Sequence, residues 1–304
     1  MNRLSPDVDV HQHLWPESVV AALRARTRPP RLRGWTLELA GEPAFAVDPD
    51  DHDVGARAAL ATDDALGTAV VSLSSALGIE TLPGDDAREL LEAWHEGASS
   101  LPAPFTAWAA ASLRPVDPDA VAAALDRGCV GLQLPADVLA DRAGYEHVAP
   151  LLDLLEERGR PLLVHPGPAP AGSSEGPAWW PAMVAYVQQM HASWFAWRIY
   201  GRPRHPRLRV CFAMLAGLAP LHAERFAARA HERSPVDAGV FLDVFFYGPR
   251  AVDAVVRVVG VDPLVHGSDR PYAPPPELDL GDAVAYAVRA ANPRRLLEPP
   301  GDAP

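Results

Sequence analysis

The chain has 304 residues, of which 48% are hydrophobic, and its formal net charge is −12. All 27 basic residues are arginine, and they form no dense basic patch, which argues against nucleic acid or an anionic membrane as a partner. The N-terminal MNRLSPDVDV lacks the pattern of a signal peptide, and no run reaches the roughly 18 apolar residues of a membrane helix. Cys129 and Cys211 lie within apolar runs, as buried reduced thiols do. We therefore expect a cytoplasmic protein that acts on a small molecule.

Short apolar runs bounded by Gly, Pro or Asp alternate along the chain with longer stretches of helical period. The runs that predict strands cover residues 8–13, 68–74, 105–113, 129–135, 161–167, 208–215, 239–246 and 263–269. The stretches that predict helices cover residues 85–98, 117–127, 145–158, 180–200, 220–233, 249–259 and 281–291.

Eight strands, each followed by a helix, predict the α/β class and a closed (β/α)₈ TIM barrel of the metal-dependent hydrolase type, formed by residues 1–304 as one domain. An open doubly wound sheet is the alternative, but it needs a Gly-rich turn after the first strand, where this chain has HQHLWP. The Pro- and Arg-rich residues 24–53 are expected to form an insertion over the barrel mouth.

Polar residues at the carboxyl ends of barrel strands indicate where the active site lies. In the first strand, Asp9, His11 and His13 share one face by the two-residue period, with roughly 6.6 Å of rise between the two histidines. His165 ends the fifth strand and Asp269 ends the eighth. Three imidazoles and one carboxylate at one mouth suit a divalent ion, best Zn²⁺, with a position left open for water.

These motifs give the chain a resemblance to the amidohydrolase superfamily, in the branch around aminocarboxymuconate-semialdehyde decarboxylase. The segments that carry it are DVHQH, VHPG, HPRLRV, FLDV and HGSDRP, in the family's order over most of the chain. The resemblance implies a distorted (β/α)₈ barrel with one catalytic divalent ion, usually zinc, held by His11, His13, His165 and Asp269. It also implies hydrolysis or non-oxidative decarboxylation, and a homodimer by analogy.

One position departs from the family pattern. The resemblance implies a His at the end of the sixth strand, which acts as acid and base or polarises the substrate, but Met214 stands there. A thioether cannot carry a proton and is a poor ligand for such an ion. Met214 is therefore assigned to substrate contact only. His222, in the first turn of the next predicted helix, is a candidate catalytic replacement, and a solvated surface histidine is the alternative.

Further residues near the predicted mouth have two interpretations each. Trp179 and Trp180 could form an apolar wall over the substrate, or could begin a helix packed on its neighbour. Arg270 could receive a substrate carboxylate, or could pair with a loop acid such as Glu277. Asp243 could accept a hydrogen bond from a histidine of the site. His191 and His266 are expected to have packing or structural roles.

Three functions follow from this site. The first is a metal-dependent hydrolase of a small amide, ester or lactone, in which Asp269 is both ligand and general base. The second is a non-oxidative decarboxylase of a small aromatic or unsaturated acid, which Met214 makes less favourable. The third is a catalytically weakened barrel that binds metal or ligand without turnover. An empty metal site would instead favour the related metal-independent lactonases, which also have an HQH-L-W-like start.

Overall fold

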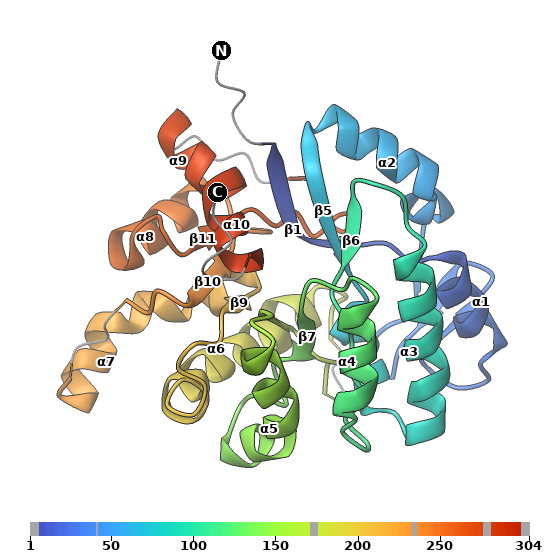
Figure 1. Cartoon of the computed structure of the whole chain (residues 1–304), viewed down its shortest axis with the longest axis horizontal. Coiled ribbons are helices and arrows are strands. Elements are labelled where there is room, and N and C mark those ends of the chain that lie inside the picture. Colours follow the sequence, from blue (N-terminus) through green and yellow to red (C-terminus); the bar gives the residue numbers. More distant parts are fainter. Residues whose placement is uncertain (1–5, 41, 171–175, 233–235, 276–280, 299–304) are drawn as a thin grey trace.

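The computed structural model describes residues 6–40, 42–170, 176–232, 236–275 and 281–298. Within these ranges a ring of parallel strands occupies the centre, with helices around it (Figure 1). The barrel strands are β1 (Asp7–His13), β5 (Leu66–Ser72), β6 (Phe105–Ala107), β7 (Leu132–Pro135), β8 (Leu162–His165), β9 (Val210–Phe212), β10 (Val240–Asp243) and β11 (Leu264–Val265).

The ring closes through two short contacts between a three-stranded and a five-stranded sheet. The sheets have the strand orders β1-β5-β6 and β11-β10-β9-β8-β7. The parallel bridge Ala109↔Leu132 joins β6 to β7, and the bridge Gln12↔Arg270 joins β1 to the segment after β11. The closed (β/α)₈ barrel is thus confirmed, and the open doubly wound sheet is excluded.

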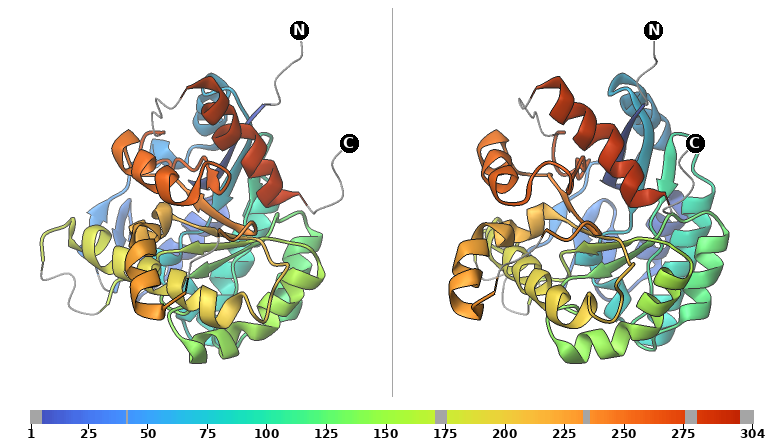
Figure 2. Two further views of the ribbon diagram at one scale, coloured as in Figure 1. Left: turned by 90° about the vertical axis from the view of Figure 1, so that its left-hand side faces the viewer. Right: turned by 60° about the vertical axis from the view of Figure 1, so that its left-hand side comes forward.

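The helices form the outer layer that the sequence pattern predicts, as the side views show (Figure 2). Most of them follow a barrel strand in the chain and pack an apolar stripe against the outer face of the sheet. The helix α8 begins and ends at the predicted residues. The helices are α1 (Glu17–Ala25), α2 (Val54–Asp63), α3 (Gly84–Ser99), α4 (Pro118–Asp126), α5 (Arg142–Glu157), α6 (Tyr186–Ala196), α7 (Ala223–Ala230), α8 (Pro249–Val259), α9 (Asp282–Tyr286) and α10 (Asn292–Leu297).

Side chains from almost every strand fill the inside of the barrel. They form a buried cluster separate from the larger core between the barrel and its helices. Filled interiors of this kind make such barrels packed cores, so ligands bind at the mouth instead. Cys211 belongs to this interior cluster, and both it and Cys129 are buried free thiols, as predicted. No described helix is long and apolar enough to cross a membrane.

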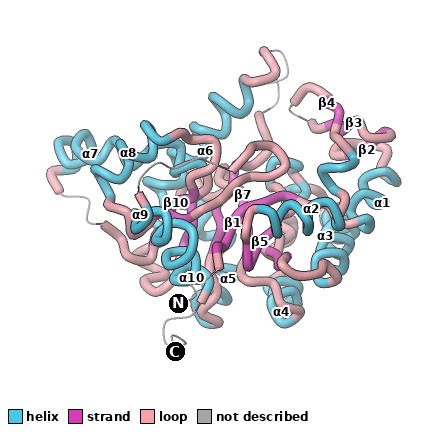
Figure 3. The backbone as a smooth tube through the Cα atoms, turned by 90° about the horizontal axis from the view of Figure 1, so that it is seen from above, coloured by secondary structure: helices cyan, strands magenta, loops and turns pink. Residues whose placement is uncertain are grey.

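Residues 24–53, the predicted insertion over the barrel mouth, have secondary structure of their own. The helix α1 extends into them, and a small antiparallel sheet follows, set apart from the barrel strands (Figure 3). His52, at the end of this segment, stacks on Trp15 with 4.2 Å between ring centroids, and accepts a hydrogen bond from the Trp15 N–H. Trp35 continues the stack at 6.3 Å. The sheet comprises β2 (Arg31–Arg33), β3 (Thr36–Glu38) and β4 (Phe45–Ala46).

The sixth barrel strand is shorter than predicted. It ends at Phe212, and the backbone from Met214 to Leu218 then has φ between 47° and 62° at all five residues. This is a left-handed turn, which costs a non-glycine residue roughly 1–2 kcal/mol. The predicted strand over 208–215 was therefore too long, because a continuous apolar run does not show where the backbone changes hand. The following helix, predicted from residue 220, begins at Ala223.

Candidate metal centre

The four predicted ligand residues lie together at the barrel mouth. One ligand atom from each of His11, His13, His165 and Asp269 lies within 4.8 Å of the others, and all four residues are buried. The Nε2 atoms of His11 and His13 are 3.2 Å apart. Asp269 Oδ1 lies 2.9 Å from His13 Nε2 and 3.5 Å from His11 Nε2.

The outer nitrogen of each ring has a partner that can only accept a hydrogen bond. His11 Nδ1 lies 2.6 Å from Asp243 Oδ2, and His13 Nδ1 lies 3.0 Å from the carbonyl oxygen of Ser72. His165 Nδ1 lies 2.9 Å from the carbonyl oxygen of Pro166. With Nδ1 donating to these oxygens, each ring keeps a lone pair on Nε2 when it is neutral.

Three lone pairs and a carboxylate thus face one another with no donor between them. Such a group of acceptors is unfavourable when buried unless a cation or a proton satisfies it. Three imidazole nitrogens and one carboxylate oxygen match the ligands of a catalytic zinc site. The residues present therefore fit a divalent ion.

Charge and burial shift the pKa of His11 in opposite directions and that of His165 in the same direction. Burial lowers the pKa of His11, but the carboxylates of Asp243 and Asp269 outweigh it and hold this pKa above its ordinary value. Burial, together with the nearby His11 and His13, lowers the pKa of His165 well below its ordinary value. The ring of His165 is therefore neutral at physiological pH and available as a ligand.

The contact between Asp243 and His11 confirms the predicted hydrogen bond. Asp243 is the last residue of β10, and its own Oδ1 accepts a hydrogen bond from the Phe245 N–H. The carboxylate is thus held at both oxygens, and it fixes the plane of the His11 ring. A side chain at position 267 would lie 2.8 Å from the Asp243 carboxyl group, so Gly267 allows this close approach.

Asp9 does not join the cluster, contrary to the expectation that it shares the face of His11 and His13. The pairing of β1 with β5 shifts register between Asp9 and Gln12, which breaks the two-residue period. Asp9 instead accepts hydrogen bonds from the backbone N–H groups of His11 and Ser268. The Asp9 carboxylate thus joins β1 to the segment before Asp269. The backbone of Asp269 is left-handed, with a φ of 59°.

The predicted anion-binding residue Arg270 is engaged elsewhere. Its guanidinium pairs with Asp64 at 2.8 Å, while Glu277 lies outside the described residues. Arg57, which the sequence did not single out, is buried behind the metal cluster and donates to the His13 carbonyl and to Gln12 Oε1. Burial and the charge of Arg270 lower the pKa of Arg57 to about 10, so it stays charged at neutral pH. Its contacts fix the end of β1.

Two aromatic rings lie beside the cluster. The Phe245 ring centroid is 4.9 Å from that of His11, and the Tyr272 ring centroid is 5.4 Å from that of His13. Sequence reasoning missed both, although each follows a singled-out aspartate by two or three residues. The rings give the surroundings of the ligands an apolar, planar character.

The candidate replacement for the missing histidine is His222, in the segment after β9. His222 is exposed and packs edge-on against His191, with ring centroids 5.0 Å apart. Among the described contacts, none joins His222 to the metal ligands, so its catalytic role stays a prediction. Met214 is nearly buried, just after the residue pair Val164↔Phe212 that sets it beside the end of β8. His266 is buried 3.7 Å from Asp9 Oδ2, consistent with a structural role.

The N-terminal end of α6 approaches the loops of the mouth. Gln189 accepts from the Gly167 N–H, just after His165, and a side chain at Gly217 would lie 2.7 Å from the Val187 carbonyl oxygen. Tyr186 donates a short hydrogen bond to Glu42, and burial raises the pKa of that carboxyl group. Trp179 and Trp180, just before this helix, are 58% and 42% exposed, so their role as a substrate wall stays a prediction.

No protein-family model matches the sequence, and no curated protein matches it either. Solved structures, however, share its fold over nearly the whole chain. IDCase from Metarhizium anisopliae, in apo form, has a TM-score of 0.74 and 18% identity, covering 96% of this chain and 97% of the other. The 5-carboxyvanillate decarboxylase LigW from Sphingomonas paucimobilis has a TM-score of 0.74 and 15% identity, covering 97% and 99%.

A third structure shows a metal in such a fold. The 5-carboxyvanillate decarboxylase LIGW2 from Novosphingobium aromaticivorans, a D314N mutant with bound manganese and 3-methoxy-4-hydroxy-5-nitrobenzoic acid, has a TM-score of 0.72 and 15% identity, covering 97% and 98%. Other similar structures are described as amidohydrolases. The chain therefore shares the fold of solved structures that are described as decarboxylases and amidohydrolases, which is the fold that the resemblance in the motifs implied.

Proposed function

We propose that this chain is a metal-dependent enzyme that removes the carboxyl group of a small aromatic acid without oxidation. The observation that carries the proposal is the cluster in which the Nε2 atoms of His11 and His13 approach Asp269 Oδ1 and His165 lies beside them, an arrangement that only a cation or a proton satisfies. We infer that the resident ion is Zn²⁺ from its nitrogen-rich ligand set, and Mn²⁺ is the alternative that the manganese-bound neighbour supports.

Decarboxylation replaces hydrolysis as our first choice of reaction. The sequence favoured hydrolysis, but several structures that share the fold are described as decarboxylases. Phe245 and Tyr272 also support a planar, aromatic substrate, since their rings flank the ligand residues His11 and His13. When bound, the ion would attract the substrate's acidic oxygens and disperse their negative charge.

The reaction requires one proton. As the bond between the ring and the carboxyl carbon breaks, its electron pair stays on the ring carbon, which must take up a proton while carbon dioxide leaves. Asp269 is the carboxyl group in the cluster and can carry that proton. Met214 cannot carry a proton, whereas a histidine at its position could. Proton delivery is therefore left to Asp269 alone.

Hydrolysis of an amide, ester or lactone remains the second candidate, because it does not require a proton-carrying residue after β9. A water molecule and one general base suffice, and Asp269 can supply the base. The presence of Met214 is the specific observation that favours this alternative.

A two-panel assay separates the candidates. Protein supplied with Zn²⁺ or Mn²⁺ is incubated with hydroxybenzoic acids while carbon dioxide release is recorded, and with lactones, esters and amides while acid release is recorded. We expect carbon dioxide release from at least one hydroxybenzoic acid. Acid release from the second panel without any carbon dioxide from the first would contradict the proposal and establish a hydrolase.

A further inference from the structure

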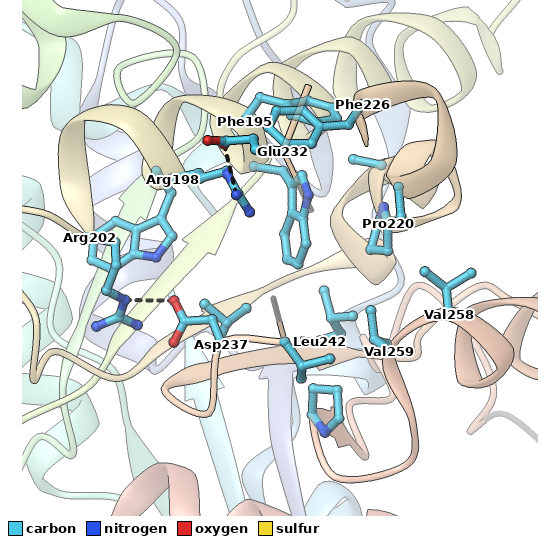
Figure 4. Close-up of a pocket in the computed structure, with 17 residues that line it drawn as sticks. Phe195, Arg198, Arg202, Pro220, Phe226, Glu232, Asp237, Leu242, Val258 and Val259 are labelled. Atoms are coloured by element: carbon cyan, nitrogen blue, oxygen red, sulfur yellow. Dashed lines mark hydrogen bonds and ion pairs between the residues drawn. The ribbon is translucent and has the colours of Figure 1, made fainter. Parts of the chain in front are cut away.

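The two ends of α6 have different surroundings. At its C-terminal end, Phe195 and the residues that follow it line an apolar cavity on the outside of the barrel (Figure 4). The charged side chains of that wall pair with one another, Arg198 with Glu232 at 3.0 Å and Arg202 with Asp237 at 2.6 Å. These charges hold the outer segments together, whereas the polar side chains at the other end of α6 lie beside the barrel mouth.

The N-terminal end of α6 lies between two loops of the mouth. On one side, Gln189 accepts a hydrogen bond from the Gly167 N–H, in the loop that follows the proposed ligand His165. On the other side, the turn after β9 approaches the Val187 carbonyl oxygen so closely that its glycine has no room for a side chain. Tyr186, the first residue of α6, is therefore placed at the mouth.

Tyr186 joins this end of α6 to the insertion of residues 24–53. Its hydroxyl group donates to Glu42 Oε1, and both side chains are partly buried. Burial raises the pKa of Tyr186, and Glu42 raises it further, so the hydroxyl keeps its proton and remains the donor. No described residue donates to the second carboxylate oxygen, Glu42 Oε2. Glu42 thus has one oxygen fixed in place and one oxygen left to accept another hydrogen bond.

Glu42 lies near an aromatic ring that borders the metal cluster. The centroid of the Tyr272 ring is 5.4 Å from that of the His13 ring. Burial raises the pKa of the Tyr272 hydroxyl, and the carboxylates of Asp269 and Glu42 raise it further. Charges influence one another mainly over short distances. Asp269 and Glu42 therefore lie on either side of one part of the mouth, with Tyr272 between them.

Two arginines beside this part of the mouth are held by protein groups. Arg57 donates to the His13 carbonyl oxygen, and Arg270 pairs with Asp64. Neither is available to a second anionic group of a substrate. A carboxylate with a vacant acceptor, close to aromatic rings, instead suits an uncharged N–H or O–H group on a planar molecule.

We propose that Glu42 accepts a hydrogen bond from an amino or hydroxyl substituent of the substrate, on the part of the ring away from its carboxyl group. The substrate class is then an aromatic acid that carries a second, uncharged donor group. This assignment rests on the proposed function, because it takes the carboxyl group of the acid to be held at the metal centre. Tyr186 acts through Glu42 and is a positioning residue.

Two pairs of hydroxybenzoic acids test the assignment. They are 4-amino- and 4-methylsalicylic acid, and 5-amino- and 5-methylsalicylic acid. The amino and methyl groups are similar in size, but only the amino group donates a hydrogen bond. Calorimetry gives the Kd of each acid with the Zn²⁺-loaded protein, and carbon dioxide release is recorded in the same samples. We expect the wild type to bind at least one of the amino-substituted acids about tenfold more tightly than its methyl partner.

Three variants locate the preference. Glu42→Leu removes both acceptor oxygens and should bring the two affinities within twofold, whereas Glu89→Leu, an exposed control on α3, should keep the tenfold preference. Tyr186→Phe should reduce the preference to about threefold, while a purely structural tyrosine would weaken the binding of both acids equally. Circular dichroism checks that each variant is folded.

The outcomes separate this assignment from the proposed reaction. Equal affinities for both members of each pair in the wild type, or an unchanged preference in Glu42→Leu, would overturn the role of Glu42. A preference that depends on Glu42, without any carbon dioxide release, would support that role and overturn the proposed decarboxylation. No binding of any of the acids would overturn both.

Discussion

The two sides of the barrel mouth differ in the side chains that their backbone carries. At the ends of β1 and β8, three buried histidines have their outer nitrogens bonded to oxygen atoms, and those of β1 have their inner nitrogens within 3.5 Å of Asp269 Oδ1. After β9, five successive residues have left-handed backbone, but the side chains are those of Met, Leu, Ala, Gly and Leu. Strained backbone is typical of functional sites. Here, the strained backbone lies after β9, whereas the acid–base side chains lie on the opposite side, in the histidine cluster.

The largest expected effect comes from removing the carboxylate on the polar side. Asp269→Asn should lower turnover on the order of 10³-fold, about 4 kcal/mol of transition-state stabilisation, because both the ligand and the proton carrier are lost. The measurement is kcat for whichever acid the wild type decarboxylates. Asp253→Asn, on the outer helix α8, is the matched control and should leave kcat unchanged. Equal turnover in the two variants would place the chemistry elsewhere in the mouth.

A smaller effect, on metal affinity, is expected when Asp243, which orients the His11 ring, is changed. Asp243→Asn removes the charge beside His11 Nδ1 and should weaken metal binding about 10–100-fold, the usual cost of losing such a support. Competition with a chromophoric chelator measures the affinity, again with Asp253→Asn as control. An unchanged metal Kd would mean that the contact only packs the ring.

Measurements of unfolding free energy can test whether the left-handed turn after β9 stores strain. Ala216 (φ 52°) and Ala124, in the helix α4, are both fully buried. Glycine at either position loses the same methyl group, but only at Ala216 does it relieve left-handed strain, while in α4 it weakens a helix. Ala216→Gly should therefore be more stable to denaturant than Ala124→Gly by about 1–2 kcal/mol. Equal unfolding free energies would show that the turn stores no strain.

The last prediction concerns the pH dependence of stability through His52, which follows the small sheet in the chain. Burial lowers the pKa of His52 to about 3, below its ordinary 6.5. The unfolded chain therefore takes up this proton first, and the stability that neutral His52 contributes is lost as pH falls from about 6.5 toward 3. Between pH 6 and 4, wild type should lose up to about 1.4 kcal/mol more unfolding free energy per pH unit than His52→Asn. Parallel pH profiles would contradict this assignment.

Much of this organisation could be predicted because it depends on short sequence patterns. Apolar runs bounded by Gly or Pro gave all eight barrel strands, and residues at the strand ends gave the four members of the cluster. Parallel strands that close into a barrel must bring their carboxyl ends to one mouth, so local position was enough.

The remainder depends on contacts between distant segments. Arg57 donates to Gln12, 45 residues away, and its helix α2 was not predicted. Glu42 meets Tyr186 across 144 residues. The stack of Trp15, His52 and Trp35 forms within a Pro- and Arg-rich stretch that has no clear period, so composition alone could not indicate the small sheet. The left-handed turn after β9 carries no local signal beyond Gly217.

The central claim is that His11, His13, His165 and Asp269 hold one divalent ion. Its most direct test is titration of chelator-treated protein with Zn²⁺, followed by elemental analysis after desalting. We expect one ion per chain in the wild type and in Asp253→Asn, and none in a variant that combines His13→Ala with His165→Ala and remains folded by circular dichroism. No retained ion in the wild type, or one ion per chain in the double variant, would contradict the account.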